Sequence, residues 1–336
     1  MPGKNFLSSA VTLPGTISRI LKNISIQKKF LQEHIAPIIQ NCMNNNDGSI
    51  DDGDIKKINS YYGLAVPAIL GEAFCALRGT AMTHSERLAS TAQGAMTGLF
   101  DDFFDKDYLS DEAVENIIKN QGQAGKKKSN QALFDIFYKT ALAHVPDKKL
   151  LVNALIDVYK AQVLSKRQVN PHIATDELLD ITMHKGGSSV LFYRTAFSPA
   201  ISNAEHQLIF NLGAMMQLGN DIFDVYKDRE SGISTLITNA RHMADIRRLL
   251  QTRLETYFAD AFSLGYPKRN TRAFLDIISI GVYSRCFVCL NQLEKNEKKS
   301  GGVFDVHAYT RKQLICDMDT NMNMLQSAIK HIFVVP

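Results

Sequence analysis

Apolar residues recur every three to four positions along almost the whole chain, which is the period of an amphipathic helix. This pattern predicts helices over residues 16–43, 53–78, 83–108, 110–120, 129–144, 148–167, 174–197, 201–229, 238–263, 270–297 and 304–333. Turn-forming residues fill the gaps between them, as in Asn44 to Gly48 and Gly122 to Gly125. The period-two alternation typical of strands is absent. The sequence therefore predicts an all-α fold.

Composition supports one globular domain. The chain has 336 residues, of which 45% are hydrophobic and 21% charged, as in ordinary globular proteins. It holds 9 prolines and 20 glycines, too few for a sandwich or barrel with a turn every ten residues or so. We find no internal repeat and no long linker. We therefore assign residues 1–336 to a single all-α domain, including an N-terminal helical segment over residues 1–50.

Charge and cysteine content narrow the class further. The net charge of +4 is widely spread, so we expect no nucleic-acid partner. The odd, scattered set of five cysteines indicates a reducing, cytoplasmic location without a disulfide framework. Cys286 and Cys289 form a CxxC pair, but in an apolar stretch without a second pair, which favours buried thiols over a zinc or redox site. No run of about 18 apolar residues occurs, so we expect no transmembrane segment.

The first candidate site lies at the end of the predicted helix 83–108. Asp101 and Asp105 are four residues apart and face the same way on a helix, with Asp102 one step round. Near a helix C-terminus these carboxylates, the first acidic cluster, repel one another and also meet the negative end of the helix dipole. Neighbouring phenylalanines argue against a simply solvated surface. We expect the small residues from Thr91 to Gly98 to leave room for a cavity.

The second candidate site is a polar stripe on the predicted helix 201–229. At about 100° per residue, one arc of that helix holds Gln217, Asn220, Asp221, Asp224 and Asp228. The last four form the second acidic cluster. Their stripe is either the water-facing side of an amphipathic helix or a cation site. Its short, oxygen-rich side chains favour the cation site, because a solvated face is usually rich in Lys and Glu.

Two oxygen-rich clusters suit a hard cation such as Mg²⁺, which is held by a few carboxylates, waters and substrate phosphates. Basic side chains would complete such a diphosphate site, and the candidates are Lys185, Arg194, Lys227 and Arg229. Arg194 and Arg229 are equally well explained as surface residues. The pair Gly186-Gly187 interrupts the helical pattern beside Lys185. Either the helix breaks there and presents backbone N–H groups to an anion, or the glycines allow another helix to pack closely.

Together these motifs resemble those of the class I terpenoid (isoprenoid) synthases. The segment from Asp101 to Asp105 is similar to the first motif of that family, DDxxD. The segment from Asn220 to Asp228 is similar to its second motif, at an acceptable spacing of about 120 residues. The resemblance spans roughly residues 70–235. It implies a helical bundle around a central cavity, with the two metal-binding motifs facing each other across it.

Three branches of that family share these features. Terpene cyclases place ligands at the i, i+4 and i+8 positions of the second motif, here Asn220, Asp224 and Asp228. Chain-elongating prenyltransferases carry a second DDxxD, to which residues 220–224 are close, but the sequence signature of their acceptor site is missing. Squalene/phytoene-type synthases repeat DxxxD, which residues 101–105 and 224–228 satisfy, but their tyrosine-rich signature is missing.

The cyclase resemblance implies an Mg²⁺-dependent terpene synthase, a carbon–oxygen lyase that ionises a linear prenyl diphosphate and cyclises the carbocation. It implies three Mg²⁺ ions, or Mn²⁺, bound by Asp101, Asp102, Asp105, Asn220, Asp221, Asp224 and Asp228. All of these except Asp221 are also predicted to be catalytic. Lys185, Arg194 and Lys227 would bind the diphosphate. The alternatives are a prenyl-chain-transferring enzyme or a non-catalytic helical protein with solvated acidic stripes. By analogy with related folds, the protein could be a homodimer.

Overall fold

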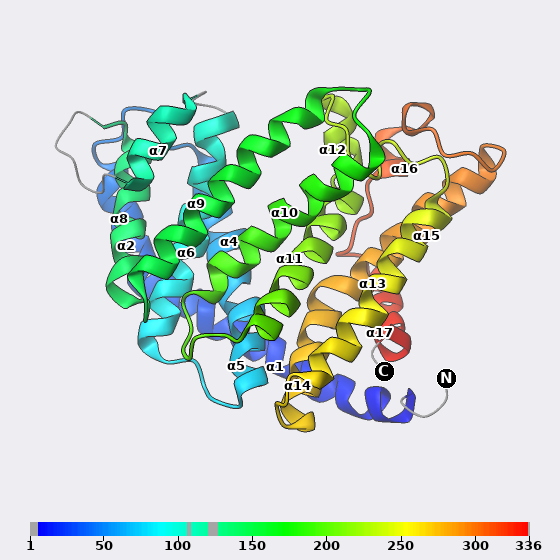
Figure 1. Cartoon of the computed structure of the whole chain (residues 1–336), viewed down its shortest axis with the longest axis horizontal. Coiled ribbons are helices and arrows are strands. Elements are labelled where there is room, and N and C mark those ends of the chain that lie inside the picture. Colours follow the sequence, from blue (N-terminus) through cyan, green and yellow to red (C-terminus); the bar gives the residue numbers. More distant parts are fainter. Residues whose placement is uncertain (1–5, 106–108, 120–126, 335–336) are drawn as a thin grey trace. The chain divides into compact units, whose positions relative to one another are not determined.

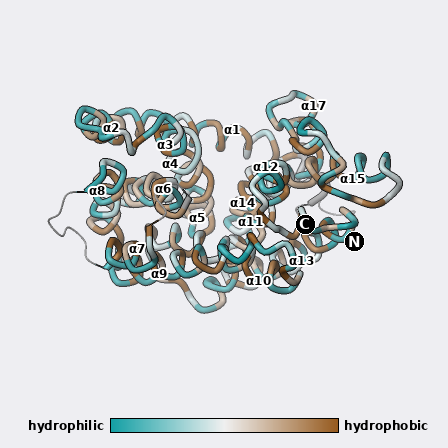
Figure 2. The backbone as a smooth tube through the Cα atoms, turned by 90° about the horizontal axis from the view of Figure 1, so that it is seen from above, coloured by the Kyte–Doolittle hydropathy of each residue, from teal (hydrophilic) through white to brown (hydrophobic). Residues whose placement is uncertain are grey.

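The computed structural model describes residues 6–105, 109–119 and 127–334. Within these ranges every regular element is a helix and no strand occurs, which confirms the all-α prediction (Figure 1). Most helices alternate between hydrophilic and hydrophobic segments along the backbone, as amphipathic helices do (Figure 2).

The first half of the chain forms α1 to α9, with three π-helical turns set into the longer helical stretches. In chain order these elements are α1 (Phe6–Phe30), a π-turn (Leu31–Ile35), α2 (Ala36–Met43), α3 (Asp52–Lys56), a π-turn (Lys57–Tyr61), α4 (Tyr62–Ala65), a π-turn (Val66–Gly71), α5 (Glu72–Arg78), α6 (His84–Asp105), α7 (Asp111–Lys119), α8 (Ser129–His144) and α9 (Lys148–Ser165). The first helix begins earlier than the predicted start at residue 16.

The second half continues the helical pattern. Its elements are a 3₁₀ turn (Lys166–Val169), α10 (Thr175–Arg194), α11 (Asn203–Phe223), α12 (Val225–Glu230), α13 (Met243–Ser263), α14 (Lys268–Ile278), a π-turn (Ser279–Tyr283), α15 (Ser284–Lys299), a 3₁₀ turn (Val306–Ala308), α16 (Arg311–Leu314) and α17 (Asn321–Val334).

The predicted helix 304–333 is wrong, because local side-chain hydrogen bonds interrupt it. The Asp317 carboxylate accepts a bond from the Asp319 backbone N–H (2.9 Å). The Asn323 amide donates to the Asp317 carbonyl at 2.7 Å. Such short-range bonds compete with the helical ladder and favour a turn. The helical pattern is therefore divided between α16 and α17.

The chain packs as two compact units. The N-terminal unit comprises Ser18–Val158 and Phe192–Ala200. The C-terminal unit comprises Met1–Ile17, Tyr159–Leu191 and Ile201–Pro336. The division falls within α1, α9 and α10. The predicted single domain stays a prediction, and each unit is described below by itself.

In the N-terminal unit, α6 packs against α8 and α4. Its apolar face joins an aromatic core, in which the rings of Phe100 and Phe103 lie 5.9 and 5.2 Å from that of Phe134. In the C-terminal unit, α11 packs against α13 and α15. The two acidic clusters therefore lie at the ends of helices that core packing holds in place.

Two helical stretches, Asp52–Arg78 and Lys268–Lys299, are long and apolar enough to cross a membrane by length and composition alone. Over half of the most apolar window of each is buried within the protein, 56% and 72% respectively. Buried core helices of soluble proteins meet the same criterion, so this finding is weak evidence for a membrane span.

Candidate active site

The second acidic cluster lies where α11 passes into α12. The Ser202 hydroxyl caps the start of α11 by accepting a bond from the Glu205 N–H. At the other end, Asp224 separates the two helices, yet its N–H bonds to the Asn220 carbonyl and its carbonyl accepts from the Asp228 N–H, both at 2.8 Å. The helical course therefore continues through the junction, close to the predicted helix 201–229.

Asp221 is the buried member of this cluster, with 4% of its surface exposed. Its carboxylate accepts hydrogen bonds from the Gln217 amide (2.8 Å) and the Thr182 hydroxyl (3.4 Å). Burial raises its pKa to about 6, against the opposing effects of these bonds and of the positive charge on Lys185. Lys185 and Thr182 lie on α10, so α10 and α11 together form this side of the site.

Asp228 is the member of the cluster whose pKa is raised by two other carboxylates. Burial and, next, the negative charges of Asp221 and Asp224 raise its pKa to about 7, against the opposing charges of Lys227 and Lys185. Asn220, which is exposed, donates a hydrogen bond to the Asp224 carboxylate at 3.4 Å. The second cluster therefore lies along one junction within the influence of the charges of Lys185 and Lys227, the latter exposed on α12.

Glycines on α10 and α11 make this juxtaposition possible. A Cβ atom on Gly186 would lie 2.0 Å from the Gly213 carbonyl oxygen, and one on Gly213 would lie 2.1 Å from the Gly186 oxygen. α10 runs unbroken through Gly186 and Gly187, and Figure 1 shows it alongside α11. Of the two interpretations of this glycine pair, close helix packing is correct and the helix break that presents N–H groups to an anion is wrong.

In the first acidic cluster, Asp101 and Asp102 lie in the last turns of α6, while the side chain of Asp105 lies outside the described residues. Asp102 is 3% exposed, and its Oδ1 lies 2.6 Å from the ammonium of Lys57. Asp101 is half-buried and lies near Tyr193. Burial and the negative charge of Asp101 raise the pKa of the Tyr193 hydroxyl, which hydrogen-bonds Thr97 at 2.9 Å.

The small residues that precede this cluster are in close contact with neighbouring elements. A Cβ on Gly94 would lie 2.4 Å from the Tyr62 carbonyl oxygen, and one on Gly98 would lie 2.9 Å from the Lys57 side chain. The described part of the N-terminal unit therefore uses these small residues for close packing. The predicted cavity beside them stays a prediction.

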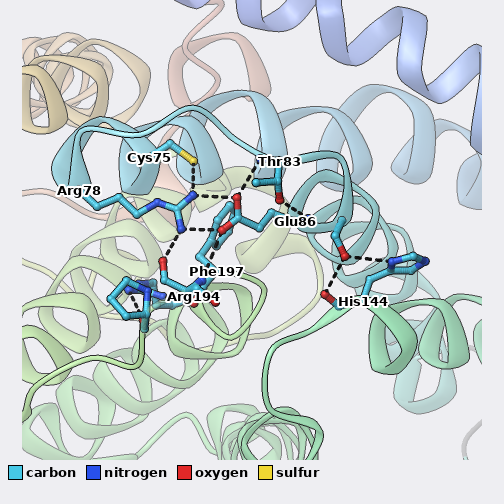
Figure 3. A network of polar contacts seen from close by, with 10 residues as sticks. Cys75, Arg78, Thr83, Glu86, His144, Arg194 and Phe197 are labelled. Atoms are coloured by element: carbon cyan, nitrogen blue, oxygen red, sulfur yellow. Dashed lines mark hydrogen bonds and ion pairs between the residues drawn. The ribbon is translucent and has the colours of Figure 1, made fainter.

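Arg194, predicted to bind diphosphate, is 5% exposed and bonds to the backbone instead. Its guanidinium donates to the carbonyls of Phe197 (2.6 Å) and Pro199 (3.1 Å). Figure 3 shows it beside the ion pair of Arg78 and Glu86, whose closest atoms are 2.5 Å apart. These contacts favour a structural role for Arg194, which fixes the segment after α10.

Among the described residues, no three histidine, cysteine or acidic side chains lie close enough together to hold a metal ion. The second cluster nevertheless fits Mg²⁺ in its donor chemistry, because it supplies oxygen ligands whose mutual repulsion a cation would relieve. The first cluster fits less simply, because the Lys57 cation already pairs with Asp102. Separately, a hollow of about 240 Å³ lined by residues such as Leu178, Leu236 and His242 includes none of the predicted site residues.

The chain was compared with protein families, curated proteins and solved structures. No family model matches the sequence. No curated protein matches it either. Among solved structures, a dehydrosqualene synthase determined in complex with a ligand is similar over 94% of this chain and 97% of that chain, at 13% identity and a TM-score of 0.47.

Sequence reasoning missed two residues near the clusters. Lys57 is 45 positions from Asp102, and Thr182 is 39 positions from Asp221, so no helical spacing relates either pair. The sequence features that could have indicated these partners are two glycines within helices. Gly98 lies one turn before Asp102, and Gly213 lies two turns before Asn220, each where another segment comes close.

Proposed function

We propose that this protein is an Mg²⁺-dependent synthase that acts on a linear prenyl diphosphate, and that its reaction is that of a terpene cyclase. The observation that carries the proposal is the charge arrangement of the second acidic cluster. Three carboxylates follow one another along one partly buried junction near the charge of Lys185. Burial, together with the negative charges of Asp221 and Asp224, raises the pKa of Asp228 to about 7. Such repulsion is costly for a merely structural surface, but a cation-binding site requires it.

In this proposal, different residues bind the metal and the diphosphate. Asn220, Asp224 and Asp228 would hold Mg²⁺, with Asp221 behind them oriented by Gln217 and Thr182. Bound Mg²⁺ would supply charge neutralisation for the departing diphosphate. Lys185 and Lys227 would place positive charge beside the same group. Asp101 of the first acidic cluster is a further proposed ligand of Mg²⁺.

A prenyl-chain-transferring reaction is the second candidate. The negative charge of Asp221, like that of Asp224, raises the pKa of Asp228, so the cluster acts as a set of three carboxylates. A cyclase would need only the ligands at 220, 224 and 228. The hydrogen bond from Gln217 to Asp221 also suits the glutamine that precedes the second motif of prenyltransferases.

The test is incubation of purified protein with C10, C15, C20 and C25 prenyl diphosphates, with and without isopentenyl diphosphate and Mg²⁺, followed by mass analysis. A hydrocarbon or alcohol formed from one substrate alone supports the cyclase. A longer diphosphate that requires isopentenyl diphosphate, or a doubled chain, supports chain transfer. Absence of diphosphate release from every substrate would reject both reactions and favour the non-catalytic alternative.

A further inference from the structure

Lys57 lies between two buried carboxylates of the N-terminal unit. Its Nζ is 2.6 Å from Oδ1 of Asp102 on α6 and 4.0 Å from Oδ1 of Asp54 on α3. Asp54 and Asp102 are 2% and 3% exposed, whereas about a third of the lysine side chain is exposed. One ammonium group therefore lies within ion-pairing distance of two buried carboxylates.

Local structure on α3 fixes one side of this arrangement. Asp51 and Asp54 form a capping box, in which the carboxylate of each residue accepts a bond from the backbone N–H of the other (2.9 and 3.0 Å). Lys57 follows Asp54 by three residues and begins the π-turn Lys57–Tyr61. Its charged end is therefore held beside Asp54 by its own helical segment.

On α6, the sequence leaves room for the lysine stem. Gly98 is one turn before Asp102, and a Cβ at that position would lie 2.9 Å from Cδ and 3.0 Å from Cβ of Lys57. Any side chain there would have to push the stem aside. The glycine costs helical stability, about 1 kcal/mol relative to alanine. Its presence allows Lys57 to pass over the helix and reach Asp102.

We propose that Lys57 is a built-in cation of the first acidic cluster, which neutralises Asp102 and takes the place that a divalent ion would otherwise hold beside it. The inference rests on the proposed function only in treating this cluster as a metal site. A unit positive charge at this distance both removes the need for a metal ion at Asp102 and repels one. The metal ligands of the cluster then exclude Asp102, although its motif position resembles that of a ligand.

The experiment compares Mn²⁺ binding, measured by electron paramagnetic resonance of free Mn²⁺, in the wild type and in Lys57→Met. Removing the ammonium exposes Asp102 to the metal, so we expect binding to tighten by about tenfold. Thermal unfolding in the same samples should show Lys57→Met less stable than the wild type without metal and more strongly stabilised by Mn²⁺. Lys56→Met, at an exposed neighbouring lysine, is the matched control and should behave as the wild type.

Two further variants keep the test decisive. Lys57→Met combined with Asp102→Asn should lose the added Mn²⁺ affinity, because the carboxylate that Lys57 pairs with is gone. If Lys57→Met does not fold, Gly98→Ala retains both charges and displaces the stem, so it should give a smaller gain in the same direction. Equal Mn²⁺ affinity in the wild type and in the folded lysine or glycine variant would overturn the inference, as would a gain that survives Asp102→Asn.

These readouts separate the inference from the proposed function. A wild type that releases no diphosphate from any prenyl substrate, together with tighter Mn²⁺ binding in Lys57→Met, would reject the function and leave the role of Lys57 intact. Normal turnover of the wild type with unchanged Mn²⁺ affinity in Lys57→Met would support the proposed function and reject the role of Lys57.

Discussion

The contact between α10 and α11 allows a quantitative prediction for Gly213→Ala. The added methyl group would lie 2.1 Å from the Gly186 carbonyl oxygen and 2.9 Å from the Gly187 Cα. Both neighbours are backbone atoms, so no change of rotamer can relieve the overlap and the helices must move apart. Overpacking of this kind costs about 1–3 kcal/mol. Here we expect the upper end of that range, about 3 kcal/mol, since the obstacle is backbone.

Helix propensity opposes this cost, because alanine is about 1 kcal/mol better than glycine in a helix interior. The expected net loss in the free energy of unfolding is therefore about 2 kcal/mol. The matched control is Gly15→Ala in α1, where nothing lies within 4 Å of the new Cβ. This control should be at least as stable as the wild type.

The assay is urea unfolding followed by circular dichroism, with prenyl diphosphate turnover measured on the folded variants. Separating α10 from α11 should also weaken the 3.4 Å bond from Thr182 to Asp221 and move Lys185 away from the carboxylates. We therefore expect turnover to fall together with stability. A Gly213→Ala protein as stable as Gly15→Ala would refute the packing argument.

Three further predictions concern single side chains. Asp228→Asn should reduce Mg²⁺-dependent diphosphate release roughly 100-fold if this carboxylate is a ligand of the metal. Glu230→Gln, on the same helix, should leave the rate of diphosphate release within about twofold of the wild type. Equal effects of the two variants in a turnover assay would contradict the site assignment. Burial lowers the pKa of His331 to about 4. Because the unfolded chain takes up this proton near pH 6.5 and the folded protein does so only near pH 4, the free energy of unfolding is highest above pH 6.5 and falls by about 3 kcal/mol as the pH drops from 6.5 to 4. His331→Gln should flatten the unfolding free energy measured across that range, and an unchanged slope would show that other groups dominate. Arg194→Met should lower stability by about 2 kcal/mol, because it leaves the carbonyl of the buried Phe197 without this donor. KM for the prenyl diphosphate should stay unchanged, and a large rise in KM would instead restore the predicted role in diphosphate binding.

Helical periodicity predicted most of this fold because the amphipathic pattern is a property of each segment alone. The predicted helix 129–144 coincides with α8 (Ser129–His144), and 148–167 differs from α9 (Lys148–Ser165) by two residues at its end. The prediction over 304–333 was wrong because Asp317 bonds to its own neighbours, and a period of 3.6 residues does not register such bonds.

Spacing within one helix predicted the second acidic cluster for the same reason. It could not show that Asp221 is buried against Thr182, or that Asp102 is paired with Lys57, because those partners come from other helices. The mid-helix glycines are the sequence features that carry such information. Gly98 and Gly213 each weaken their helix, and each occurs where a second segment must approach within van der Waals distance. In this protein, a glycine within two turns of each acidic cluster lies where a second segment approaches, and that segment carries a partner of the cluster, Lys57 or Thr182. Such partners must be identified before the carboxylates are counted as metal ligands.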